Sequence, residues 1–173
     1  MKTRRLVALA FLVALSTALH YFEGFIPLVS IPGYRLGLSN LVSLFALYYY
    51  GIPSFLFVSI ARVFLVALIA SGFGPTFLMS LSGCLFAIVG TLLVHRLVKG
   101  SIFSVSAVSA LFHSIGQLTA YAIFFQMPYI FVYLALLGPI SIATGLAIAF
   151  LDRLVVKRLP SSFREEESRR RKQ

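Results

Sequence analysis

Carboxylates are scarce in this sequence. Asp and Glu together number 5 of 173 residues, and all charged residues amount to 12%, against roughly 25% in an average soluble domain. Asp152 is the single Asp, and three of the four Glu fall in the C-terminal tail. Enzymes that process a diphosphate with Mg²⁺ hold the metal with several carboxylates. The sequence therefore argues against a catalyst of that kind.

Other catalytic patterns are also missing. The single Cys84 rules out an intrachain disulfide. There is no Gly-rich phosphate loop ahead of a Lys, no GxSxG and no cluster of His, Cys and carboxylates. His20 and Glu23 could share a metal ion, but two ligands are too few for a dedicated site. We expect neither enzyme activity nor a cofactor in this chain, so any use of ATP falls to partner proteins.

Hydrophobic residues, in contrast, are abundant. They make up 60% of the chain, the mean hydropathy is +0.96, and apolar runs of roughly 18 residues or more recur along it. The sequence thus predicts an integral membrane protein. The net charge of +10 does not indicate nucleic-acid binding, because the basic residues cluster at the ends of apolar runs. We interpret the first run as a retained helix, since no clean small-x-small cleavage site follows it.

Gly and Pro residues divide the apolar sequence into predicted helices. The six expected ranges are about 5–22, 36–50, 53–70, 76–98, 102–126 and 129–156. Gly138 and Pro139 predict a kink in the last of them. We expect residues 1–159 to form one all-α transmembrane domain and residues 160–173 to form a charged, disordered cytoplasmic tail.

The basic residues predict how the chain is oriented. Apart from Arg35 and Arg62, every Lys and Arg precedes the first predicted helix, separates the fourth from the fifth, or lies at or beyond the end of the sixth. Six spans place all of these residues on one side of the membrane, which the positive-inside rule assigns to the cytoplasm. The sequence therefore predicts a multi-pass protein of the plasma membrane with both termini cytoplasmic.

Arg62 is the most unusual residue of the apolar segments. It lies nine residues beyond Pro53, which at 1.5 Å per residue is a depth of about 13 Å. An Arg in mid-membrane costs about 2.5–3.5 kcal/mol on insertion scales, so it must face the bundle interior and find acceptors. One interpretation is a ligand for an anion or carbonyl group of a substrate. The other is a structural Arg bonded to helix carbonyls and polar neighbours.

Three other predicted helices carry polar side chains that would be wasted facing lipid. Each alone is more often an interhelical hydrogen bond than a ligand contact, but together with Arg62 they predict a polar cavity in the outer half of the bundle. The candidate substrate-binding residues on these helices are Asn40, Ser80, His113, Gln117 and Tyr121, with Ser43, Ser82 and Ser109 nearby.

The polar segment 31–40 lies just before and within the second predicted helix. Pro32 and Gly33 suit a hinge, and Tyr34 and Arg35 are expected to close the site from outside as a lid. We expect Glu23 either at the water interface or paired with Arg35.

Small side chains form a stripe on the first predicted helix. Ala10, Ala14 and Ala18 are spaced four residues apart, which lets another helix approach closely in lipid. The stripe can serve internal packing or the docking of another subunit.

Several segments resemble the Gx transporter family, which has the older name heptaprenyl diphosphate synthase component I. They are the RLGLSN segment at 35–40, Gly51, Arg62 and the LSG segment at 81–83. This family is grouped with the substrate-binding S components of energy-coupling factor (ECF) transporters. The resemblance implies a six-helix S-component fold with substrate bound under the external loop. It also implies a transmembrane T subunit docked on the Ala stripe, two cytoplasmic ATPases that use ATP, and toppling of the S component during transport.

Two function hypotheses follow from the residues and the resemblance. The first is a substrate-binding S subunit for a small micronutrient or metabolite, anionic or isoprenoid- or quinone-related. The alternative is a noncatalytic membrane component associated with a polyprenyl (heptaprenyl) diphosphate synthase. A self-sufficient secondary carrier is disfavoured, because the membrane segments have almost no carboxylates for proton or Na⁺ coupling.

Overall fold

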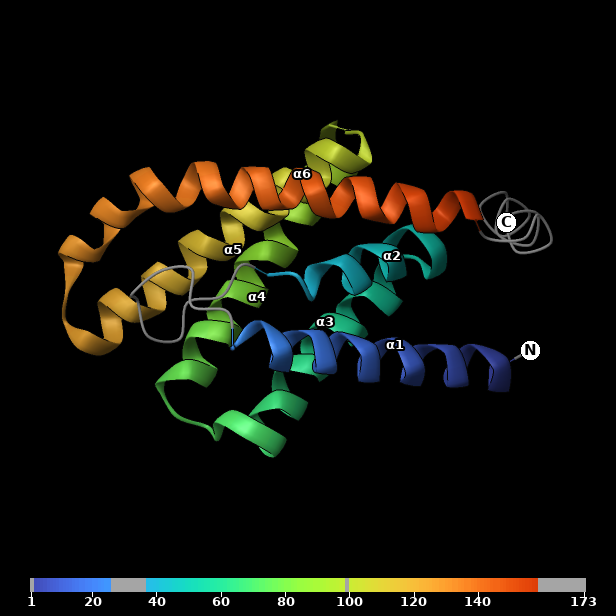
Figure 1. The fold of residues 1–173 in the computed structure, drawn as a ribbon, viewed down its shortest axis with the longest axis horizontal. Helices are drawn as coiled ribbons and strands as arrows, with labels where there is room; N and C mark the ends of the chain where they lie inside the picture. The colour runs from blue at the N-terminus through green and yellow to red at the C-terminus, as the bar shows by residue number, and fades with distance from the viewer. Residues whose placement is uncertain (1, 26–36, 99, 159–173) are drawn as a thin grey trace.

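The computed structural model describes residues 2–25, 37–98 and 100–158, and all regular structure in this part of the chain is helical (Figure 1). The helices, in chain order, are α1 (Lys2–Glu23), α2 (Asn40–Tyr50), α3 (Ile52–Val66), α4 (Pro75–Leu93), α5 (Ile102–Phe125) and α6 (Leu134–Arg158). Short π-helical turns extend α3 and α4 over Ala67–Ser71 and Val94–Val98, and a 3₁₀ helix spans Pro128–Tyr133.

The helix ends follow from local sequence. Pro75 is the first residue of α4 and Pro53 lies in the first turn of α3, where a missing N–H costs nothing. The side chain of Ser101 caps α5 by accepting a hydrogen bond from the Ser104 N–H at 3.3 Å. Gln126 ends the same helix in a left-handed conformation, with φ of 57°.

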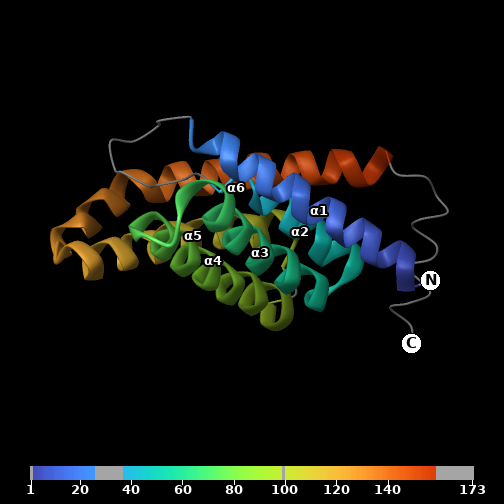
Figure 2. The same cartoon turned by 90° about the horizontal axis from the view of Figure 1, so that it is seen from below.

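Within the described ranges, five helical segments are long and apolar enough to cross a membrane, so the chain is a helical, multi-pass membrane protein. Their ranges are Arg5–Glu23, Ile52–Ser71, Pro75–Val98, Ile102–Phe125 and Pro128–Val155. The predicted helix 36–50 differs, because α2 begins only at Asn40 and has 11 residues. Six spans and cytoplasmic termini stay predictions. The beginning of α1 and the end of α6 do lie at the same end of the molecule (Figures 1 and 2).

The described helices pack as two groups. We call α1, α2 and α3 the α1–α3 half, and α4, α5 and α6 the α4–α6 half. The most extensive contact joins α4 to α5, followed by that of α5 with α6, whereas α3 touches α4 much less. A buried apolar cluster lies between the halves and contains Leu44 and Phe55 from one side, and Ile88, Val105 and Ile148 from the other.

The predicted tail at 160–173 lies outside the described residues, as does the hinge at Pro32 and Gly33. Pro139 lies inside α6, as expected from the sequence. The predicted start of the last helix near residue 129 is only partly matched, because residues 128–133 form a 3₁₀ helix before α6 begins.

A candidate ligand site at Arg62

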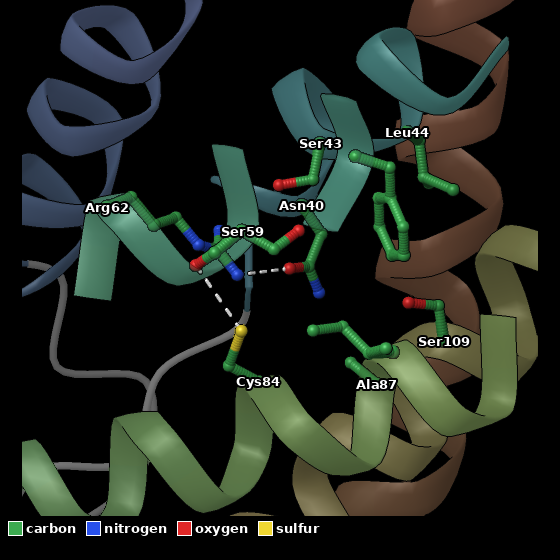
Figure 3. Close-up of a pocket in the computed structure, with 10 residues that line it drawn as sticks. Asn40, Ser43, Leu44, Ser59, Arg62, Cys84, Ala87 and Ser109 are labelled. Carbon is green, nitrogen blue, oxygen red and sulfur yellow. Dashed lines mark hydrogen bonds between the residues drawn. The ribbon is translucent and has the colours of Figure 1, made fainter. Parts of the chain in front are cut away.

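Arg62 is 1% exposed on α3, and its guanidinium points toward the first residues of α2 (Figure 3). One terminal nitrogen donates a hydrogen bond to the Ser39 hydroxyl, and the other donates to Oδ1 of Asn40 at 2.6 Å. Both acceptors are neutral, and Arg62 forms no ion pair with any residue that the structure describes. A buried cation is therefore held by hydrogen bonds alone, without an opposite charge.

The acceptors belong to a turn of residues 37–40 that leads into α2, here called the α2 turn. The N–H of Asn40 donates to the Gly37 carbonyl at 2.8 Å. Gly37 has φ of +85°, a conformation that residues with a Cβ rarely adopt. A Cβ at this position would also lie 3.0 Å from Nδ2 of Asn40. Gly37 thus allows the turn to place Ser39 and Asn40 against Arg62.

A polar face of α1 holds the other side of the α2 turn. The Ser16 hydroxyl donates to the Ser39 carbonyl at 3.2 Å, and Nδ1 of His20 lies 3.3 Å from the Ser39 hydroxyl. The carboxylate of Glu23 accepts hydrogen bonds from the N–H groups of Gly37 and Leu38. We call these three α1 residues, the α2 turn and Arg62 the polar network. It fixes the start of α2 between α1 and α3.

Glu23 is 3% exposed, so the expectation of a carboxylate at the water interface is wrong. The physical reason is that two backbone N–H groups at the start of α2 need an acceptor, and a carboxylate at a helix N-terminus supplies a strong one. The alternative pairing with Arg35 lies outside the described residues. No group of three or more metal-ligating side chains occurs among the described residues.

A closed, tightly packed cavity lies beside Arg62, between the two halves of the bundle. It is nowhere wide enough for the centre of a water-sized sphere, so the halves must move apart before a ligand can enter. Cys84 of α4 is one of the lining residues, and its thiol donates to the Ser59 carbonyl of α3 at 3.4 Å (Figure 3). The lining residues are Asn40, Ser43, Leu44, Phe55, Ser59, Arg62, Cys84, Ala87, Ile88 and Ser109.

Two polar side chains of α5, those of His113 and Gln117, pack against Gly83 of α4 and do not line this cavity. A Cβ built on Gly83 of α4 would lie 2.8 Å from Cγ of Gln117 and 2.9 Å from Cε1 of His113. The His113 ring also reaches the α2 turn, where its Cδ2 would lie 3.6 Å from a Cβ at Gly37. Both side chains are buried, and the amide of Gln117 has no hydrogen-bond partner among the described residues. Gly83 thus makes room for the side chains of His113 and Gln117.

The predicted site residues therefore divide into groups. Asn40 and Arg62 contact each other, and the His113 ring lies near the α2 turn, with Gln117 beside it at Gly83; neither α5 side chain lines the cavity. Ser80 is buried but does not line the cavity. Tyr121 packs in a separate cluster with Leu118 and pairs with the Phe125 ring at 4.5 Å between centroids. Tyr34 and Arg35 lie outside the described residues.

Sequence reasoning missed the roles of Ser16, Ser39 and Glu23. A signal was present, because Ser16, His20 and Glu23 are spaced four and three residues apart and so share one face of an otherwise apolar helix. The predicted Ala stripe lies elsewhere on α1, and Ala10, Ala14 and Ala18 are all exposed in the isolated chain.

A protein-family model for heptaprenyl diphosphate synthase component I matches residues 12–155. The chain belongs to this family. The matched range contains α2 to α5 and every described residue of the polar network. No curated protein and no solved structure is detectably similar to the chain. Membership of the component I family therefore rests on sequence similarity. The contacts of Arg62 and its neighbours come from the structure.

Proposed function

We propose that this component I family member is the substrate-binding membrane subunit of an ATP-driven, ECF-type uptake transporter. Its cargo is a small polar or anionic metabolite, with isoprenoid- and quinone-related compounds as candidates. The proposal rests mainly on Arg62, a buried cation whose hydrogen-bond partners among the described residues are neutral. Arg62 lies beside a cavity between the two halves of the membrane bundle.

The physical argument rests on cost. An Arg in a membrane interior is expensive to insert and tends to mark a site that interacts with an anion or a polar substrate. A structural Arg alone needs enough acceptors for its donors, yet Nε of Arg62 and Nδ2 of Asn40 are buried without a hydrogen-bond partner among the described residues. Unused donors that converge on a cavity support a role in holding a ligand.

The exposed face of α1 supports a T subunit as one of the proposed partners. Ala10, Ala14 and Ala18 are exposed, whereas Ser16, His20 and Glu23 face inward. The Ala stripe would let a helix of a T subunit pack closely. Two cytoplasmic ATPases would bind the T subunit and use ATP, and this chain would need no cofactor of its own.

A second candidate function is supported by the family description itself. The chain would be a noncatalytic membrane component of a polyprenyl diphosphate synthase, whose soluble partner would supply the carboxylates. Among the described residues only Glu23 and Asp152 are carboxylates, which supports a noncatalytic role in either case.

Co-purification separates the two functions. A tagged chain expressed from its native context is expected to retain a T subunit and ATPases under the first proposal, and a soluble Asp-rich synthase under the second. Recovery of the synthase without ATPases would overturn the transport proposal.

Uptake measurements then test the site. Arg62→Ala is expected to abolish ATP-dependent uptake while the protein still inserts into the membrane. Arg153→Ala is a matched control, because Arg153 is exposed and contacts only the Phe103 ring at 6.0 Å among its described interactions. Full uptake by Arg62→Ala would contradict the site assignment.

A further inference from the structure

We infer that the cavity at Arg62 takes a ligand with a single negative charge, of the carboxylate class, carried on an apolar body. This inference rests on the proposed ligand site. It goes further by excluding phosphate esters and diphosphates as the group that Arg62 binds.

The charge of the site limits the charge of the ligand. Among the described residues, Arg62 is the only buried Lys or Arg. Glu23, the carboxylate of the polar network, bonds to backbone N–H groups of the α2 turn and does not contact Arg62. One monoanion would neutralise the guanidinium. A phosphate monoester carries about −1.5 to −2 at pH 7, and a diphosphate carries more, which would leave negative charge buried without a partner.

The geometry favours a carboxylate. A planar guanidinium matches a carboxylate with two parallel N–H···O bonds. In this structure Oδ1 of Asn40 accepts the bond that one ligand oxygen would take, at 2.6 Å from Arg62. Nε of Arg62 and Nδ2 of Asn40 both lack hydrogen-bond partners within the described part of the chain, so they can bond to a second oxygen. The amide oxygen of Asn40 thus occupies the position of a ligand oxygen on Arg62, and the ligand would displace it.

The rest of the cavity lining is mixed, with the hydroxyls of Ser43, Ser59 and Ser109 beside an apolar part. Beyond Arg62, the cavity is bounded by Leu44, Phe55 and Ile88, three side chains of the cluster between the halves. Burying apolar ligand surface against them contributes roughly 25 cal/mol per Å². Once the halves separate, a ligand with a carboxylate at one end and a hydrocarbon body at the other would meet Arg62 on one side of the opened space and this apolar part on the other.

A panel of three probes tests the charge rule on the purified full-length chain. Benzoate has one carboxylate on an apolar ring, benzamide is its neutral counterpart, and inorganic pyrophosphate has several charges without an apolar body. At about ten times its dissociation constant, benzoate is expected to raise the melting temperature by about 3–5 °C, and to lose this effect in Arg62→Gln. Benzamide and pyrophosphate are expected to have no effect. Equal or greater stabilisation by either of them, or none by benzoate, overturns the inference.

Asn40→Asp supplies a second, independent test. The new carboxylate would lie where Oδ1 accepts from Arg62, so the chain would provide its own anion. We expect the melting temperature to rise by about 4 °C and stabilisation by benzoate to disappear. Asn40→Ala is the control that removes the acceptor without adding charge, and it is expected to lower the melting temperature. A variant Asn40→Asp that still responds to benzoate like the wild type, or melts below Asn40→Ala, contradicts the inference.

These tests separate this inference from the transport proposal. Arg62-dependent stabilisation by benzoate in a chain that co-purifies with a synthase would retain the monoanion site and remove the transport function. Stabilisation by pyrophosphate in a chain that co-purifies with ATPases would retain the transport function and overturn the monoanion site.

Discussion

The α1–α3 half and the α4–α6 half are held together by different means. In the first, polar side chains from three helices meet at the α2 turn, with Arg62 and Ser39 at the centre. In the second, glycines bring helix backbones into direct contact, and serines donate to carbonyls of the neighbouring helix. Examples are the bonds from Ser82 to Gly116 at 2.8 Å and from Ser106 to Gly145 at 2.6 Å.

This difference indicates that one half is rigid and that the other can rearrange. Close backbone contact leaves no room for rearrangement, because close-packed interiors transmit strain and do not deform continuously. Hydrogen bonds to side chains can exchange one acceptor for another. We therefore interpret the α4–α6 half as a rigid wall and the α2 turn with Arg62 as the part that responds to a ligand.

The largest expected effect of a substitution lies in the rigid half. A Cβ on Gly116 would lie 2.6 Å from the Ser82 carbonyl and 2.9 Å from Cα of Gly83, and backbone atoms cannot move aside cheaply. Gly116→Ala is expected to lower the free energy of unfolding by about 3 kcal/mol, measured by thermal melting of the purified protein. Gly74→Ala is the control, since nothing lies within 4 Å of its added Cβ. Similar melting of the two variants would contradict the rigid-wall interpretation.

A smaller loss is expected at the centre of the polar network. Ser39→Ala removes the hydroxyl that accepts from Arg62 and lies 3.3 Å from Nδ1 of His20, leaving buried polar groups without that partner. We expect a cost of about 2 kcal/mol in thermal melting. In comparison, Ser82→Ala should cost only about 0.5–1 kcal/mol, because the Gly116 carbonyl belongs to a helix that already bonds it. Equal costs would remove the distinction between the halves.

A small effect on stability is expected at the contact between α4 and α5 around Gly83. A Cβ on Gly83 would meet the side chains of Gln117 and His113, which can turn away. Gly83→Ala is therefore expected to cost about 1 kcal/mol in thermal melting and to weaken ligand binding more than tenfold, measured as loss of retained ligand. Unchanged retention of ligand would show that His113 and Gln117 do not contribute to the site.

The sequence predicts the membrane class and most helix positions well, because apolar runs and breakers act locally. Arg62 stands out for the same reason, since a charge within an apolar run is anomalous wherever the helix packs. Asn40 and His113 were proposed from their spacing on a helix face, and their role in binding stays a prediction. In contrast, the start of α2 was predicted about four residues too early, because the α2 turn depends on contacts with α1 and α3 that a local pattern does not contain.

The positions of Glu23 and Tyr121 also depend on contacts that a local pattern does not contain. Glu23 was expected at the water interface or paired with Arg35, and it accepts hydrogen bonds from N–H groups that lie 14 and 15 residues further along the chain. Tyr121 shares the spacing of His113 and Gln117, but the path of α5 takes it into the cluster around Leu118. Helix periodicity predicts a shared face, whereas the length over which that face borders a cavity depends on tertiary packing.

The most direct test of the central claim is mass spectrometry of small molecules retained by the purified chain. Wild-type protein and Arg62→Ala would be extracted side by side, with Arg153→Ala as the control. We predict a small monoanionic compound that is retained by the wild type and by Arg153→Ala and is lost from Arg62→Ala. Retention of the same compound by all three proteins, or of a diphosphate that depends on Arg62, would contradict the account.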